Sequence, residues 1–318
     1  MLLSVVLPFY NPMPYFTHML ESLLVAADRF LDLSLIEIIC VNDGSSDKAM
    51  EYINQYKSYK NFHVVSVANG GVSNARNIGL TKCSGKYVWF VDADDYVPER
   101  AIGDIVRKIQ SLTSCVDIIF ANFFAFEDCD KVKKVMFNSN YNFDCFDSPD
   151  TSTDIFEIVF NQARVGFTLW NQIFKMEFLK RNKLAFNSVL RISEDFMFKV
   201  ETLYCFPRID YINVEIYGYR IPNGRQTLSQ KLPKIAELDP LMKEQVKWFY
   251  IFDKQYKYES GRRYMKLLFS ESLNYWIKYL SMYTSVEEGG YLEEKRCEMM
   301  DILEFLPEGV SALFHKGL

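Results

Sequence analysis

The N-terminal part of the chain alternates between short, uninterrupted apolar runs and segments with helical spacing. The apolar runs cover residues 2–7, 35–41, 62–68 and 87–91, and Pro8 is expected to end the first of them. Residues 15–30 show the clearest helical spacing, and a further helix is expected at 50–59. Runs that are apolar at every position are typical of strands covered on both faces. The alternation therefore predicts a mostly parallel α/β sheet flanked by helices, in which ligands bind beyond the carboxyl ends of the strands.

Acidic residues follow two of these runs directly. Asp92, Asp94 and Asp95 come after the fourth run, and Asp43 comes after the second. Carboxylates packed this closely repel each other unless a cation or hydrogen-bond donors share them. Oxygens at Asp-x-Asp spacing suit Mg²⁺ or Mn²⁺ bound together with substrate phosphates. A capped turn with solvated acids, and a plain Asp-Gly turn at Asp43, are the structural alternatives.

Two further charged sites are candidates for chemistry. Arg76 lies near the predicted start of a helix, where a guanidinium can pair bidentately with phosphate, although a surface arginine is favoured when the residue is taken alone. Glu194 and Asp195 precede the apolar residues 196–198. A carboxylate against an apolar wall can act as a general base because burial raises its pKa. Acids that interact with a helix dipole are the alternative here.

Composition narrows the class of protein. A net charge of −5 over 318 residues argues against a nucleic-acid binder that relies on phosphate contacts. The 7 cysteines have no Cys-x-x-Cys spacing and predict buried thiols in a reducing compartment. We see no signal-peptide pattern and no apolar run of transmembrane length. We therefore expect a cytoplasmic protein, with peripheral contact at the inner face of the plasma membrane left open.

The chain is expected to have two regions. Helical spacing is sustained from residue 234 onward, which predicts an α/β domain over 1–229 and a helical region over 230–318. The aromatic residues of the helical region favour core packing, with acceptor docking or interfacial membrane contact as the alternative. Residues 127–153 are polar, aromatic and rich in turn formers, and their pattern predicts no particular element.

Six segments occur in an order that resembles a known family. They are VVLPFYN at 5–11, VNDGSSD at 41–47, GGVSNARNIG at 70–79, FVDADD at 90–95, Trp170-Asn171 and Glu194-Asp195. The set resembles family 2 glycosyltransferases with the GT-A fold, over roughly residues 1–225. The resemblance implies a Rossmann-like, mostly parallel sheet with a nucleotide-binding half at about 1–97 and an acceptor half at about 98–229.

On the donor side, the resemblance implies a role for five acidic or basic residues. Asp43 would bond the base of the nucleotide, usually uracil, and Arg76 would contact the nucleotide. Asp92 would approach the ribose, and Asp94 would bind the Mn²⁺ or Mg²⁺ ion that bridges the diphosphate. Asp95 would lie nearby at the donor sugar.

The resemblance also assigns the rest of the site. Asp195 would be the base that deprotonates the acceptor hydroxyl. Pro8 and Tyr10 would border the nucleotide, and Trp170 and Asn171 would lie near the acceptor. A weaker match extends to Arg220 and Arg225, in a loop that often closes over the diphosphate.

The implied function is an inverting, metal-dependent transfer of one sugar from a UDP-sugar to a glycan or lipid-linked glycan hydroxyl. Such a reaction belongs to the synthesis of capsule, exopolysaccharide or lipopolysaccharide. The Gln-x-x-Arg-Trp motif of processive members is missing, which favours single-sugar addition. A catalytically silent nucleotide-sugar or glycan-binding module is the alternative. A sugar nucleotidyltransferase would need a glycine-rich N-terminal loop, and this chain has Pro8 and Tyr10 there. Donor sugar, acceptor, linkage and oligomeric state stay open.

Overall fold

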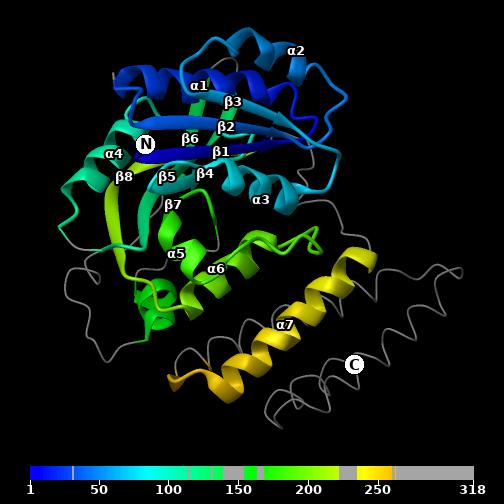
Figure 1. Ribbon diagram of the computed structural model, residues 1–318, viewed down its shortest axis with the longest axis vertical. Helices are drawn as coiled ribbons and strands as arrows, with labels where there is room; N and C mark the ends of the chain where they lie inside the picture. Colours follow the sequence, from blue (N-terminus) through cyan, green and yellow to red (C-terminus); the bar gives the residue numbers. More distant parts are fainter. Residues whose placement is uncertain are drawn as a thin grey trace, which may run out of the picture. The chain divides into compact units, whose positions relative to one another are not determined.

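The structure is a computed structural model that describes residues 1–30, 32–113, 115–129, 132–138, 154–162, 168–221, 235–259 and 262. The chain divides into two compact units, Met1–Leu232 and Pro233–Leu318. This division lies close to the sequence-based boundary between residues 229 and 230. The second unit contains helix α7 (Ile235–Gln255). All site residues discussed below belong to the first unit, which Figure 1 shows in blue to yellow-green.

The described strands of the first unit form one eight-stranded sheet. Its main path runs β3-β2-β1-β4-β7-β5-β6, and β8 pairs with β5. The strands are β1 (Leu3–Phe9), β2 (Ile36–Asn42), β3 (Phe62–Ser66), β4 (Tyr87–Phe90), β5 (Ile118–Cys129), β6 (Val132–Asn138), β7 (Gln172–Lys175) and β8 (Ile209–Arg220). Strands β1 to β4 pair in parallel, and β7 joins β4 to β5 in antiparallel pairing. The predicted mostly parallel sheet is confirmed.

Three details differ from the sequence-based expectation. Pro8 was expected to end the first strand, but β1 continues to Phe9. Pairing with β4 ends at Val6, so the ladder with β4 requires no hydrogen bond at the proline. Strand β6, within the segment for which no element was predicted, pairs with the far end of β5. The helix expected at 50–59 is short, with α2 (Ala49–Ile53) followed by one 3₁₀ turn (Asn54–Tyr56).

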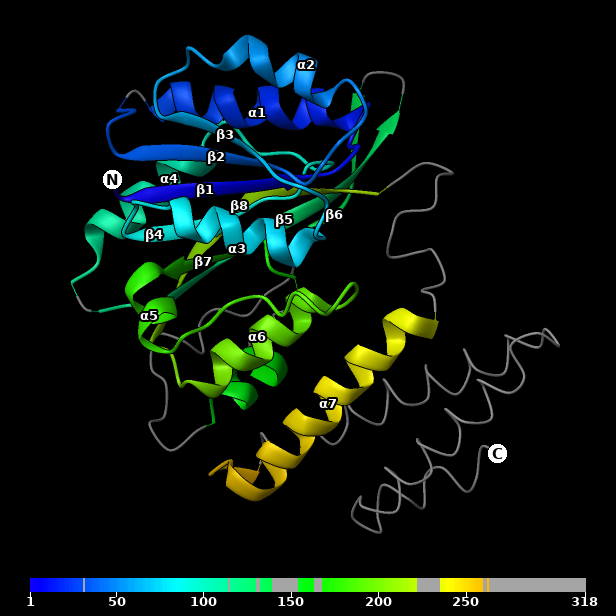
Figure 2. The same ribbon diagram turned by 45° about the vertical axis from the view of Figure 1, so that its right-hand side comes forward.

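Helices cover both faces of the sheet. Helix α1 (Tyr15–Phe30) packs against α4 (Ala101–Ser111) on one face, and α3 (Val72–Lys82) packs against β1 and β2 on the other. Figure 2 shows α1 and α2 on the opposite side of β1 from α3. Short α5 (Met176–Arg181) follows β7, α6 (Glu194–Tyr204) precedes β8, and a π-helical segment covers Glu157–Gln162.

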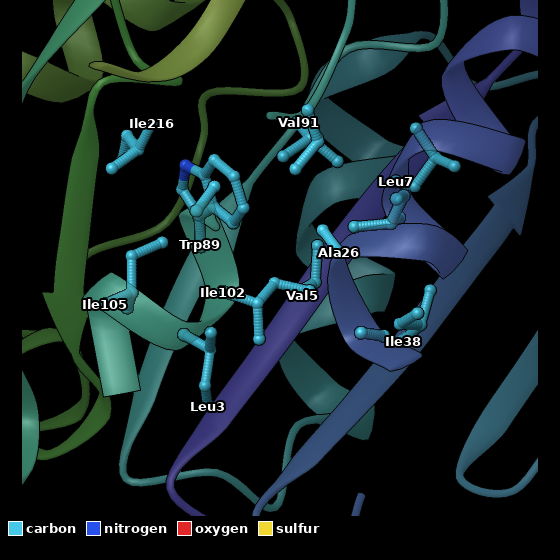
Figure 3. Packing of buried hydrophobic residues seen from close by; sticks show 14 of the residues in the cluster. Leu3, Val5, Leu7, Ala26, Ile38, Trp89, Val91, Ile102, Ile105 and Ile216 are labelled. Carbon is cyan, nitrogen blue, oxygen red and sulfur yellow. The ribbon is translucent and has the colours of Figure 1, made fainter. Parts of the chain in front are cut away.

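The core explains the continuous apolar runs. Alternate residues of β1, among them Leu3 and Val5, face the α1 and α4 side, where Ala26 and Ile102 also lie (Figure 3). Val6 points the other way and fills the space beside Gly79 of α3, where an added Cβ would lie 2.4 Å from a Val6 methyl group. Both faces of the strand are buried, so no polar alternation is possible.

Candidate active site

The loop after β4 carries three acids and is fixed in place by β8. Tyr96 and Gly218 form an isolated antiparallel bridge, with N···O distances of 3.0 and 2.9 Å. The hydroxyl of Tyr217 accepts from the backbone N–H of Asp92 at 3.0 Å and donates to the carboxylate of Asp95 at 2.7 Å. The loop therefore has a defined conformation at the carboxyl edge of the sheet, where a ligand is expected.

Asp95 connects this loop to β8 through hydrogen bonds. Its side chain is buried, and its two oxygens accept from the Tyr217 hydroxyl and from the backbone N–H of Arg220, at 2.7 and 2.8 Å. Burial and the charges of Asp94 and Asp92 raise the pKa of Asp95. These bonds make Asp95 a residue that positions β8 against the loop, and its place at the donor sugar stays a prediction.

Arg76 joins two acidic segments that are far apart in the sequence. The guanidinium is buried, and it donates to Asp92 at 3.0 Å and to Glu194 at 2.8 Å. Its partner Glu194 lies 118 positions along the chain. A contact of Arg76 with the nucleotide stays a prediction. What the structure shows is a buried bridge between the loop after β4 and the first turn of α6.

The bridge brings Asp195 to the same edge of the sheet. Burial and the charge of Glu194 raise the pKa of Asp195 to about 6, although Arg76 acts in the opposite direction. Helix α6 is anchored behind Asp195 by Phe198, whose ring stacks on Phe186 with centroids 4.1 Å apart and meets Phe90 of β4 edge-on. Asp195 is thus a carboxylate whose pKa is raised, the direction expected of a general base.

Asp43 lies at the end of β2 and holds the turn that leads into α3. Its two carboxylate oxygens accept from the backbone N–H groups of Gly70 and Gly71, each at 2.8 Å. Gly71 has φ of 88°, a conformation that favours glycine. Pro8 is buried in β1 opposite Val41, and Tyr10 follows as a 54% exposed side chain. An aromatic ring exposed beside Asp43 at this edge fits a surface for a planar base.

Trp170 and Asn171 are both buried and precede β7. The Trp170 ring stacks on Tyr217 at 4.5 Å and on Tyr219 at 5.8 Å, with interplanar angles of 10° and 13°. The Trp-Asn segment therefore supports the strand that positions the acidic loop.

Of the two arginines in the weaker match, Arg225 lies outside the described residues. Arg220 is described, and it donates from Nε to the carbonyl of Asp94 at 2.5 Å.

The arrangement matches a known family. A family model described as Glycosyl transferase family 2 matches residues 4–181. The chain belongs to glycosyl transferase family 2. The match covers the four parallel strands, the acidic loop, Arg76 and the Trp-Asn segment, while Asp195 and β8 lie beyond it.

Curated glycosyltransferases resemble about two thirds of the chain. The uncharacterized glycosyltransferase EpsJ of Bacillus subtilis (strain 168) is 29% identical over 69% of this chain and 61% of that protein. The poly(ribitol-phosphate) beta-glucosyltransferase of Bacillus spizizenii is 30% identical over 62% of this chain and 29% of that protein. The chain thus spans about three fifths or less of these relatives.

A solved structure shows the same fold. Residues 1–349 of Staphylococcus aureus TarS, in complex with UDP-GlcNAc, align with a TM-score of 0.69 at 21% identity. The alignment covers 98% of this chain and 84% of that one. This likeness confirms the predicted GT-A fold.

The family implies a divalent cation at Asp94, and a carboxylate ligand fits such an ion. Asp94 is exposed, but partial desolvation and the charge of Asp92 raise its pKa to about 6, so an added positive charge would favour its ionised form. In the part of the chain that the structure describes, no group of three or more His, Cys, Asp or Glu side chains could hold a metal. A single carboxylate suits Mg²⁺ or Mn²⁺, which keep water and substrate phosphate oxygens as ligands.

The sequence patterns assigned no function to two residues of this site. Tyr217 forms hydrogen bonds with two of the acidic residues, and Glu194 was a candidate only as the neighbour of Asp195. A hint for Glu194 was its place next to Asp195. No sequence signal connects Tyr217 with Asp92 and Asp95, because they meet only after β8 has paired in the sheet.

Among the described helices, none is long and apolar enough to cross a membrane.

Proposed function

We propose that the chain is an inverting, metal-dependent glycosyltransferase that moves one sugar from a UDP-sugar to a hydroxyl group of a cell-surface glycan. The observation that carries this proposal is the Arg76 bridge, which holds Asp92 and Glu194 at 3.0 and 2.8 Å. It joins a loop suited to a diphosphate to a helix that carries a candidate base. Leaving group and incoming nucleophile would then meet at one edge of the sheet.

In this proposal Asp195 accepts the proton of the acceptor hydroxyl. A pKa of about 6 leaves its carboxylate ionised at neutral pH and more basic than an ordinary aspartate. The acceptor oxygen attacks the anomeric carbon as the sugar–phosphate bond breaks on the opposite face, so the configuration inverts. A Mn²⁺ or Mg²⁺ ion held by Asp94 would stabilise the charge of the departing diphosphate as a Lewis acid. No covalent enzyme intermediate is required.

Donor and acceptor classes are inferred from the site and from the relatives. Pro8, Tyr10, Asp43 and Asp92 are proposed to border the nucleoside. A TarS structure of the same fold holds UDP-GlcNAc, which supports a UDP-sugar as the donor. A relative named poly(ribitol-phosphate) beta-glucosyltransferase supports a polymer of the cell surface as the acceptor class. A lipid-linked glycan is an alternative acceptor, since it also offers a sugar hydroxyl group.

The test uses the full chain and a panel of UDP- and GDP-sugars with Mn²⁺. Release of free nucleotide identifies the donor, and mass spectrometry of an acceptor extract identifies the product. Asp94→Ala should abolish metal-dependent release, and Asp195→Asn should lower the rate of transfer strongly while nucleotide binding persists. Asp104→Asn, at a partly exposed site on α4, is the matched control and should keep full activity.

A catalytically silent binding module is the alternative. It would bind a nucleotide sugar without releasing nucleotide from any donor in the panel, and Asp195→Asn would change nothing. That result, with Asp94→Ala also binding like the parent protein, would rule out the transferase.

A further inference from the structure

Cys115 and Lys175 form a close pair at the sheet edge opposite the candidate active site. Nζ of Lys175 lies 2.8 Å from Sγ of Cys115, a short contact for a nitrogen and the larger sulfur atom. Cys115 is exposed, contrary to the expectation of buried thiols, whereas Lys175 is only 7% exposed. The thiol is thus open to solvent on one side and faces a buried amine on the other.

The backbone holds this pair in register. Cys115 lies just before β5, and Lys175 is the last residue of β7. The N–H of Lys175 donates to the carbonyl of Asp117 at 2.8 Å, next to the Ile118–Phe174 pair of the antiparallel ladder. Both segments belong to the same sheet, so the two side chains meet without any change in the fold.

A carboxylate completes the cluster. Glu177 lies 2.7 Å from Nζ of Lys175, and its own side chain is 69% exposed. It accepts a hydrogen bond from the ammonium, and the contacts with Cys115 and Glu177 raise the pKa of Lys175 while Lys175 lowers the pKa of Glu177. The resting pair is therefore ammonium and carboxylate, and the amine reacts after it has lost one proton to solvent. A thiol beside a lysine and partly open to solvent is the setting in which cysteines react with oxidants.

We propose that Cys115 and Lys175 are the site of an oxidative modification, a covalent Sγ–O–Nζ bridge formed with dioxygen. One oxygen atom is inserted between sulfur and nitrogen. The other leaves as water, with one hydrogen from the amine and one from the thiol. Sulfur and nitrogen lose two electrons each, and dioxygen takes up all four. The 2.8 Å separation is too long for a direct S–N bond and leaves room for one bridging atom.

The test is mass spectrometry of the full chain, kept under reductant or exposed to air and then digested without reductant. The expected product is a crosslinked pair of peptides containing Cys115 and Lys175, heavier by one oxygen and lighter by two hydrogens. Excess dithiothreitol should separate the pair. Cys115→Ser and Lys175→Arg should each abolish it, and the arginine keeps the positive charge beside Glu177. Cys205→Ser, at another partly exposed cysteine, should keep it.

A second measurement separates the crosslink from a folding effect. Air-exposed wild type should unfold at a higher temperature than reduced wild type, because a crosslink restricts the unfolded chain. Folded Lys175→Arg should show no such difference. The proposal is overturned if Cys115 is oxidised to sulfenic or sulfinic acid while Lys175 stays unmodified. It is also overturned if the crosslink contains no added oxygen, or if the thiol stays reduced in air and in peroxide.

Discussion

At the scale of single residues, two groups of acids in the described part of the chain have opposite pKa shifts. Partial desolvation and neighbouring negative charges raise the pKa of Asp94 and of Asp195 to about 6. Glu37 is buried, but four hydrogen bonds to its Oε1 outweigh the effect of burial and lower its pKa. The first group belongs to the candidate active site, and Glu37 stabilises the opposite edge of the sheet.

If Asp195 is the base, activity should fall as the pH drops through about 6, because the protonated carboxyl cannot accept the acceptor proton. Mn²⁺ should be saturating, so that Asp94 stays ionised over the same range. Asp195→Asn should lower kcat by about 10²–10⁴-fold, the usual contribution of a general base. The measurement is the pH dependence of kcat with the donor found above. An acid limb that persists unchanged in a still active Asp195→Asn variant would assign the titration to another group.

Glu37→Gln tests the second group. A carboxylate whose folded pKa is lowered contributes stability above its unfolded value of 4.5, and this contribution is lost as the pH falls through the folded pKa. The variant should lose about 1–3 kcal/mol near neutral pH, because hydrogen bonds to a charged acceptor are the stronger ones. Urea unfolding at several pH values measures this. The two proteins should converge in acid, and Glu51→Gln, exposed on α2, should match wild type throughout.

At the scale of elements, β8 determines the conformation of the loop after β4. Tyr217 and Arg220 of β8 contact Asp92, Asp94 and Asp95 through side-chain and backbone groups. The ring of Tyr217 is in turn held by Trp170. A strand that ends more than 120 residues after the loop thus carries much of the support for its geometry.

Tyr217→Phe should disturb this support while the ring stacking stays intact. Removing the hydroxyl leaves the buried carboxylate of Asp95 and the N–H of Asp92 each without one partner, at a cost of about 1–3 kcal/mol. Thermal unfolding should show the loss, and the apparent affinity for Mn²⁺ in the activity assay should weaken. Tyr219→Phe is the matched control, since Tyr219 lies on the same strand and also stacks on Trp170. Equal effects of both substitutions would mean that the hydroxyl of Tyr217 has no special function.

At the scale of the whole molecule, the chain consists of the units Met1–Leu232 and Pro233–Leu318. The main hydrophobic cluster of the sheet, from Leu3 to Tyr217, lies entirely within the first unit. A unit with its own buried core can fold independently. The candidate active site residues also come from this unit, so its folding and its chemistry can be examined together.

A protein that ends at Leu232 should therefore fold by itself. Trp89 and Trp170 are buried in the first unit and report on its core. Their fluorescence and the far-ultraviolet circular dichroism should change together in one cooperative urea transition. The full-length chain, measured with the same probes, is the comparison. Gradual unfolding of the shorter protein, or different midpoints for the two probes, would show that residues beyond 232 are needed for the core.

Local patterns were enough to predict the parallel strands, helix α1 and the edge of the sheet where the acids lie. Residues 15–30 have helical spacing and form α1, and the continuous apolar run at 35–41 becomes β2, because spacing reports directly on which faces are buried. The placement of Asp43 and Asp92 after strands followed from the same reasoning. Strand β6 was missed because its surroundings combine polar, aromatic and turn-forming residues in no regular period.

The sequence by itself therefore determined the α/β class, the family resemblance and the acidic edge of the sheet. Only the tertiary structure decided which partners these residues have. Arg76 meets Glu194 across 118 positions, Asp95 is bonded to β8, and Cys115 lies against Lys175. The physical reason is that periodicity encodes the burial of each element, whereas pairs of polar groups form only when separate elements pack and bring their donors and acceptors within bonding distance.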